Sequence, residues 1–196
     1  VIVTPITFTA SANCVLYCGA TPVFADIDPD AWEISPREIE RKITPKTKAV
    51  ITVDYTGQAC DYSAIVRICK AHGLLLIEDA AHAVGTRYFG KPLGGIADMT
   101  TFSFHPVKTV TSGEGGAILT NSPELHQKLQ LFSKHGITHD KDQYTRDRDS
   151  QWYYEQFELG YNYRITDIQC ALLLSQLEKL ERFAARRREI TRAYRD

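Results

Sequence analysis

Residues 100–116 read T-T-F-S-F-H-P-V-K-T-V-T-S-G-E-G-G, and upstream of them residues 74–85 read L-L-L-I-E-D-A-A-H-A-V-G. Each stretch contains a short apolar run, which predicts a buried strand. Asp79 closes the upstream strand, and Lys108 follows the downstream one just before a cluster of glycines. A carboxylate and an amine at the ends of two buried strands predict a ligand site at one edge of a parallel sheet.

These two residue types match the needs of pyridoxal 5′-phosphate (PLP). A lysine forms the Schiff base with this cofactor, and an aspartate keeps its pyridine nitrogen protonated, so that the ring accepts electrons from a carbanion. A lone lysine after a strand is usually a surface residue. The context of Lys108 favours a site, because Ser103 can offer a hydroxyl to a phosphate, and Gly113, Gly115 and Gly116 allow the backbone to turn close to a ligand.

Apolar strand-like runs alternate with helical patterns along the rest of the chain. The predicted strands cover residues 1–4, 23–25, 49–53, 74–77, 99–104 and 117–120. The predicted helices cover residues 11–18, 36–43, 63–72, 123–132 and 166–195. This order predicts an α/β fold with a mostly parallel sheet and helices on both of its faces. Asp79 and Lys108 then fall at carboxyl ends of strands, where ligands bind in such sheets.

Local signals mark several helix ends. Gly19 and Gly73 stand where a helix C-cap is expected. Ser35 with Glu38 predicts a capping box, as does Thr166 with Gln169.

Composition excludes some classes of function. Of the 196 residues, 43% are hydrophobic and 24% are charged, which is ordinary for a globular domain with a substantial core. The net charge of −1 gives no reason to expect a nucleic-acid or membrane partner, and no apolar run is long enough to span a bilayer. Five scattered cysteines indicate reduced thiols and a cytoplasmic location. Cys14 and Cys18 have no second pair at ligand spacing, so no metal is expected.

Five motifs, linked along essentially the whole chain, resemble those of a known family. They are T-F-T-A at 7–10, G-A-T-P-V-F at 19–24, E-D-A-A-H at 78–82, F-S-F-H-P-V-K at 102–108 and G-Y-N-Y-R at 160–164. The family is that of the DegT/DnrJ/EryC1/StrS sugar aminotransferases. The resemblance implies the large domain of a type I PLP-dependent transferase, the aspartate aminotransferase-like fold. H-P-V-K and the helix S-Q-L-E-K-L-E resemble most the branch that aminates UDP-4-keto-6-deoxy-N-acetylhexosamines in pseudaminic acid biosynthesis.

The resemblance also implies a role for each candidate site residue. Lys108 and Asp79 are implied as the catalytic residues, the first carrying the Schiff base and the second holding the pyridine nitrogen. Phe8 would stack on the cofactor ring, Ser103 would contact the phosphate, and His82 would sit near the ring substituents. The spacing of His82 alone is equally compatible with a hydrogen bond to Asp79 or with a structural histidine.

Asn162 and Arg164 are implied to reach into the site of a neighbouring subunit and to help bind phosphate there. The implied assembly is therefore a homodimer with shared active sites.

The resemblance further implies that residues 1–166 are part of the PLP-binding large domain. Residues 167–196 would form a long helix leading toward a small C-terminal domain that these residues do not include. The family's phosphate-binding turn, which precedes a helix near the start of the domain, is also missing. Val1 already lies in an apolar strand pattern, and residues 192–196 continue a helix without a stop signal, so we expect an internal piece of a longer protein.

For the intact protein, the resemblance implies transamination of a nucleotide-linked keto sugar, with glutamate as amino donor. Alternatives are another type I PLP reaction, such as dehydration or decarboxylation, or a non-catalytic oligomerisation or regulatory module. A nicotinamide-dependent dehydrogenase is disfavoured because no G-x-G-x-x-G opens the first helix. The polar residues 139–155 predict a solvated loop, with a substrate lid as the alternative.

Overall fold

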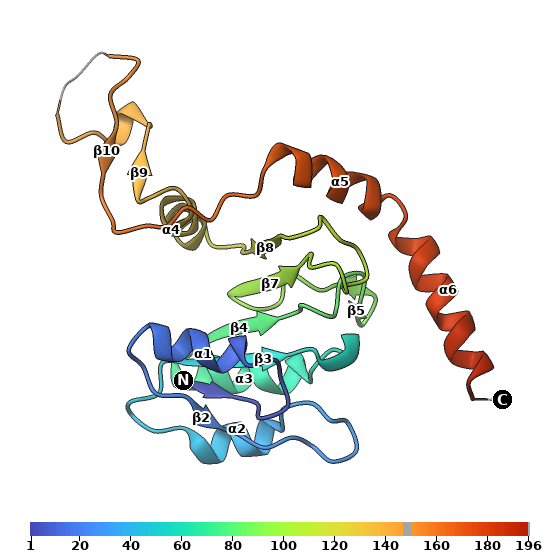
Figure 1. Ribbon diagram of the computed structural model, residues 1–196. Coiled ribbons are helices and arrows are strands. Elements are labelled where there is room, and N and C mark those ends of the chain that lie inside the picture. Colours follow the sequence, from blue (N-terminus) through green and yellow to red (C-terminus); the bar gives the residue numbers. More distant parts are fainter. Residues whose placement is uncertain (147–149, 196) are drawn as a thin grey trace. The chain divides into compact units, whose positions relative to one another are not determined.

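The computed structural model describes residues 1–146 and 150–195, and its main element is a six-stranded sheet (Figure 1). The strand order is β2-β1-β3-β4-β7-β8, and all neighbours are parallel except β7 and β8. The prediction of a mostly parallel sheet is therefore confirmed. The strands are β1 (Ile2–Val3), β2 (Val23–Phe24), β3 (Ala49–Val53), β4 (Leu75–Asp79), β7 (Met99–Ser103) and β8 (Gly116–Leu119).

One face of the sheet carries the larger hydrophobic core. Successive strand residues point to opposite faces, and Ile2, Val50 and Leu76 point to this one. They pack with buried side chains of α2 (Pro36–Lys42) and α3 (Tyr62–His72). Each fully buried aliphatic side chain stabilises the fold by about 1.5–3 kcal/mol.

The other face is covered by α1 (Ala10–Tyr17). Here Val3 and Ile51 pack with Val15 of that helix, and the half-buried Ile77 of β4 lies against the same cluster. Helices thus cover both faces, as the alternating pattern predicts, and α1 is held next to β4.

Two of the predicted helix-end signals are confirmed, and the capping box of Thr166 with Gln169 stays a prediction. Gly19 and Gly73 follow α1 and α3 with φ of 67° and 62°, a left-handed conformation that glycine adopts without steric cost. Ser122 caps α4 (Pro123–Ser133) by accepting a hydrogen bond from the backbone N–H of Leu125 at 3.3 Å. The capping box at Ser35 is wrong in detail, because this side chain makes no capping hydrogen bond at the start of α2.

The expected long helix from residue 166 to about residue 195 is wrong. The structure has two helices there, α5 (Asp167–Leu177) and α6 (Leu180–Ala193). The backbone N–H of Lys179 donates to the carbonyl oxygen of Gln176 at 3.0 Å, only three residues back, which tightens the last turn of α5. The break contains neither glycine nor proline, so the sequence has no local stop signal that predicts it.

Four two-residue strands were not expected from the sequence, because such short strands carry no periodicity. They form two antiparallel pairs, β5 (Arg87–Tyr88) with β6 (Lys91–Pro92) and β9 (Ile137–Thr138) with β10 (Glu155–Gln156). Two 3₁₀ turns complete the list of elements, η1 (Tyr55–Gly57) and η2 (Lys141–Gln143).

The predicted loop at residues 139–155 contains η2 and the first residue of β10. The Glu155 carboxylate organises part of it by accepting hydrogen bonds from the backbone N–H groups of Thr145 at 2.8 Å and Arg146 at 3.2 Å. Residues 147–149 of the predicted loop, and Asp196 of the predicted C-terminal helix, lie outside the described residues.

The chain divides into two compact units. The larger is Val1–Thr120 with Asp167–Asp196, and the smaller is Asn121–Thr166. The division into a large domain at 1–166 and a helix leading to a small domain remains a prediction. Within the part that the structure describes, none of the helices has the length and apolar character needed to cross a bilayer.

Candidate active site

A cavity of about 540 Å³ lies at the carboxyl ends of β3, β4 and β7 in the larger unit. This volume is in the range of small-molecule sites. Strand register brings the ends level, because Asp79 pairs with both Val53 and Thr101. The cavity is lined by five of the residues predicted for the site, namely Phe8, Asp79, His82, Ser103 and Lys108.

Asp79 ends β4, and hydrogen bonds hold both of its carboxylate oxygens. Oδ2 accepts from the hydroxyl of Ser11 at 2.7 Å, and Oδ1 accepts from the backbone N–H of Ala81 at 3.1 Å. The side chain is half-buried. A carboxylate bonded on both oxygens has a defined orientation and keeps free lone pairs for a cationic partner.

Lys108 follows β7 after a turn in which its backbone N–H donates to the carbonyl oxygen of His105 at 3.0 Å. The side chain is half-buried, and within residues 1–146 and 150–195 its amine has no hydrogen-bond or ion-pair partner. Two of the predicted glycines lie farther along the chain, in the loop before β8 and at the start of that strand. Gly113 has φ of 82°, and a Cβ on Gly116 would lie 2.9 Å from the carbonyl oxygen of Phe102 in the adjacent strand.

His82 lies on the cavity wall, and its environment favours the neutral imidazole. Partial burial lowers the pKa of His82 from its usual value, and the positive charge of Lys108 lowers it further, while the negative charge of Asp79 opposes both. The ring centroid of Tyr55 lies 6.4 Å from that of His82. Among the described contacts, the Asp79 oxygens accept from Ser11 and Ala81 rather than from His82.

Phe8 and Ser103 contribute two different surfaces to the cavity. The Phe8 side chain is 76% exposed, which leaves its ring available to a planar ligand. Ser103 is the last residue of β7, and its hydroxyl oxygen accepts a long hydrogen bond of 3.4 Å from the backbone N–H of His105. This weak contact leaves the hydroxyl able to bond a ligand.

Sequence reasoning missed several residues of the site. Thr7, Tyr55, His105 and Glu114 also line the cavity, and His105 Nε2 lies 3.6 Å from Glu114 Oε1. Ser11 was missed as the partner of Asp79. Tyr55 could have been found, because it follows the carboxyl end of β3 as Asp79 ends β4. Thr7 and His105 lie inside the T-F-T-A and F-S-F-H-P-V-K motifs, which could have pointed to them, whereas Glu114 lies in a loop without a comparable signal.

Asn162 and Arg164 belong to the smaller unit. Both are exposed, and Arg164 Nε donates to Asn162 Oδ1 at 2.8 Å. Their predicted role at a neighbouring subunit's site remains a prediction.

Buried acids lie next to the strand ends that form the cavity. Asp54 is fully buried and follows β3, and its Oδ1 accepts from the hydroxyl of Tyr62 at 2.7 Å and from the backbone N–H of Cys60 at 3.1 Å. Burial, reinforced by the neighbouring charge of Glu78, raises the pKa of Asp54 to about 8 despite the Tyr62 hydrogen bond. The carboxylate of Glu78 accepts from the hydroxyl of Thr100.

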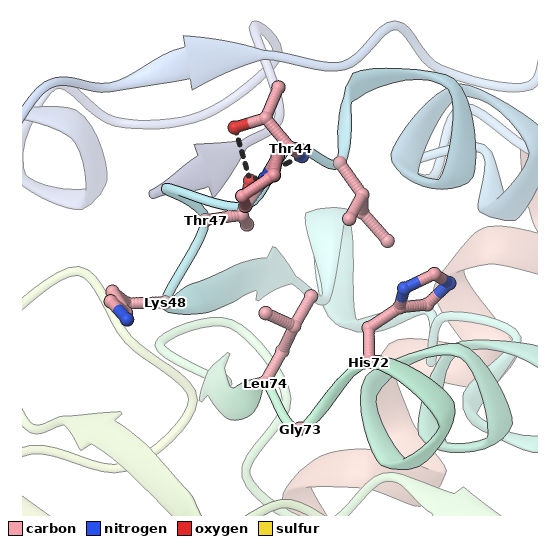
Figure 2. A pocket seen from close by; sticks show the side chains of 8 residues that line it. Thr44, Thr47, Lys48, His72, Gly73 and Leu74 are labelled. Carbon is pink, nitrogen blue, oxygen red and sulfur yellow. Dashed lines mark hydrogen bonds between the residues drawn. The ribbon is translucent and has the colours of Figure 1, made fainter.

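A second hollow, of about 380 Å³, lies at the amino ends of β3 and β4. Figure 2 shows Lys48, His72 and Leu74 around it. Its threonine hydroxyls, on Thr44 and Thr47, lie 3.4 Å apart and bond each other. Since ligands of parallel sheets bind at the carboxyl ends, the larger cavity is the better candidate for an active site. No group of three His, Cys, Asp or Glu side chains suited to a metal ion occurs among the described residues.

This chain is similar to known proteins along nearly its whole length. The model of the DegT/DnrJ/EryC1/StrS aminotransferase family matches residues 1–196. The spore coat polysaccharide biosynthesis protein SpsC of Bacillus subtilis is 44% identical over 195 residues, which cover 99% of this chain and 50% of SpsC. GDP-perosamine synthase of Escherichia coli O157:H7 is 42% identical over 194 residues, 99% of this chain and 50% of that enzyme. The chain thus spans about half the length of these relatives.

Two solved structures are similar along most of the chain. Helicobacter pylori PseC, an aminotransferase involved in the biosynthesis of pseudoaminic acid, has a TM-score of 0.84 at 40% identity, covering 92% of this chain and 46% of PseC. Spr1654 of Streptococcus pneumoniae, in its PLP form, has a TM-score of 0.86 at 34% identity, and the match covers 98% of this chain and 52% of Spr1654. The fold is that of these aminotransferases.

Proposed function

Since this chain belongs to the DegT/DnrJ/EryC1/StrS aminotransferase family, we propose that the intact protein transfers an amino group from an amino acid to a nucleotide-linked keto sugar. The cofactor of this family is PLP. One observation carries the proposal: Lys108 and Asp79 line the same cavity. The half-buried Lys108 amine has no partner among the described residues, and the Asp79 carboxylate accepts a hydrogen bond on each of its oxygens.

The residues of the cavity fit PLP. Asp79 would present its oriented carboxylate to the pyridinium nitrogen, Phe8 would offer an open ring face, and Ser103 would offer a hydroxyl to the phosphate. Lys108 is the only lysine that lines this cavity within the described residues, so it is the proposed covalent anchor. When bound, PLP supplies an electron sink that stabilises negative charge at the carbon next to the amine.

The residues of this chain supply the proton transfers. The Lys108 amine would act as the general base that takes the proton from Cα of the amino donor, and it would return that proton as a general acid. No salt bridge within the described residues has to break before it acts. The Asp79 carboxylate, held through both of its oxygens, would stabilise a positive pyridine nitrogen.

The finer proposal is that the substrate is a UDP-4-keto-6-deoxy-N-acetylhexosamine and the donor is glutamate. The support for the sugar is the 40% identity over 194 residues, 99% of this chain, to the UDP-4-amino-4,6-dideoxy-N-acetyl-beta-L-altrosamine transaminase of Helicobacter pylori. A GDP-linked keto sugar is the alternative, favoured by the similar identity of 42% to GDP-perosamine synthase. We further propose a cytoplasmic homodimer in which Asn162 and Arg164 bind phosphate at the neighbouring subunit's site.

The first test is to add PLP to the full-length protein, reduce it with borohydride and map the modified peptide by mass. A phosphopyridoxyl group on Lys108 is the expected result, and its absence would exclude the aminotransferase. Incubation with glutamate and either keto sugar then separates the substrates by the amino sugar formed. An adduct without amine transfer to any keto sugar would indicate another type I PLP reaction. No PLP binding at all would favour an oligomerisation or regulatory module.

A further inference from the structure

The hydroxyl of Ser11 links α1 to the end of β4. Ser11 is 4% exposed, and its Oγ donates to Asp79 Oδ2 at 2.7 Å across 68 residues of sequence. Hydrogen bonds to a charged acceptor are stronger than neutral ones. Ser11 and the backbone N–H of Ala81 each hold one oxygen of the carboxylate.

A second hydroxyl continues this contact into the cavity. Thr7 Oγ1 lies 2.7 Å from Ser11 Oγ. A serine hydroxyl has one proton, and an ionised carboxylate only accepts, so the Ser11 proton goes to Asp79. Thr7 must therefore donate to Ser11. The result is a directed chain from Thr7, which lines the cavity, through Ser11 to Asp79.

We propose that Ser11 is a positioning residue, whose hydroxyl holds the Asp79 carboxylate in the orientation that engages the pyridine nitrogen of bound PLP. The proposal rests on the proposed function. Among the described contacts of the carboxylate, the Ala81 N–H is the one that remains without Ser11, so Oδ2 is free to rotate away. The same turn also carries Phe8, because the backbone N–H of Ser11 donates to the Phe8 carbonyl oxygen at 3.2 Å. Ser11 thereby ties the proposed ring-stacking residue to the proposed nitrogen partner.

The test compares full-length wild-type protein with Ser11→Ala, Ser11→Thr and Thr7→Val. For Ser11→Ala we expect the affinity for PLP and the kcat of the glutamate half-reaction to fall about 10- to 100-fold, as for the loss of one hydrogen bond to a charged group. The KM for glutamate should stay unchanged, and the pH dependence of the bound cofactor's absorption should shift. Ser11→Thr keeps the hydroxyl and should restore the PLP affinity, the kcat and the pH dependence of the absorption to wild-type values. Thr7→Val should change them in the same direction by a smaller factor.

Thr9→Ala is the matched control, because Thr9 is exposed on the same turn and its side chain does not cap α1. It should behave as wild type. Thermal unfolding of each apoprotein monitors folding separately. A folded Ser11→Ala protein with wild-type PLP affinity and an unchanged absorption profile would overturn the proposal, even where turnover falls. A wild-type protein that forms no PLP adduct on Lys108 would overturn both the role of Ser11 and the proposed function. A wild-type protein that forms the adduct, with a Ser11→Ala variant that behaves like it, would overturn only the role of Ser11.

Discussion

The backbone N–H of Asp54 donates to the carbonyl oxygen of Asp79 at 3.0 Å, which joins a fully buried acid to the strand end at the centre of the candidate site. The neighbours of Asp54 in sequence, Val53 and Tyr55, both line the cavity. The position of Asp79 therefore depends on polar groups in the core as well as on the groups that face the ligand.

Asp54→Asn should flatten the pH dependence of stability. Because the pKa of Asp54 is raised to about 8, the folded protein holds a proton that the unfolded chain releases at about pH 4. This contribution to stability is complete below about pH 4 and is lost as the pH rises to about 8. The free energy of unfolding should fall by up to about 1.4 kcal/mol per pH unit in that window. Urea unfolding at several pH values measures this slope in wild type and variant.

Asp30→Asn, which removes an exposed carboxyl, is the control and should retain the wild-type slope. An Asp54→Asn protein that kept the wild-type slope would show that Asp54 is ionised in the fold.

Lys108→Ala should raise the pKa of His82. The lysine charge is one of the two causes that lower it, and burial, the larger cause, remains after the substitution. The pKa should therefore move toward the usual histidine value without reaching it. Titration of the His82 ring by NMR measures the change. The control is Lys70→Ala, at an exposed position of α3, which should leave the His82 titration unaltered. An equal pKa shift in both variants would argue against an effect of the Lys108 charge on His82.

Lys108→Ala should also abolish turnover in the full-length protein. The variant lacks both the covalent anchor and the proposed general base, and no other lysine among the described residues lines the cavity. Amine transfer from glutamate to the keto sugar measures the loss. Near-normal turnover by a folded Lys108→Ala protein would contradict the mechanism.

Asp79→Asn should keep the size of the side chain but remove its charge. We expect kcat to fall roughly 10²- to 10³-fold, the scale for losing one oriented electrostatic contact in an active site. The amide should still accept from Ser11 or Ala81, so folding should survive. Steady-state kinetics measure the loss of kcat, and thermal unfolding shows separately whether the variant still folds. A variant with wild-type kcat would remove Asp79 from the mechanism.

Much of the fold could be predicted because its signals are local. The apolar runs that became β3, β4 and β7 and the glycines after α1 and α3 need only a few neighbouring residues to be interpreted. The break between α5 and α6 could not be predicted, because it arises from one tightened turn without a breaking residue. Lys108 and Asp79 could be expected at one cavity, which both of them line, because ligand sites of parallel sheets follow the carboxyl ends of strands.

The sequence by itself determined the alternation of strands and helices and the mostly parallel sheet, since apolar periodicity is a property of the chain. The motifs that resemble the family completed the five predicted residues that line the cavity. Only the tertiary structure decided which groups hold Asp79. The Ser11 hydroxyl reaches it because α1 packs beside β4 through Val15 and Ile77. A hydrogen bond across 68 residues depends on that packing, which no local pattern in the sequence encodes.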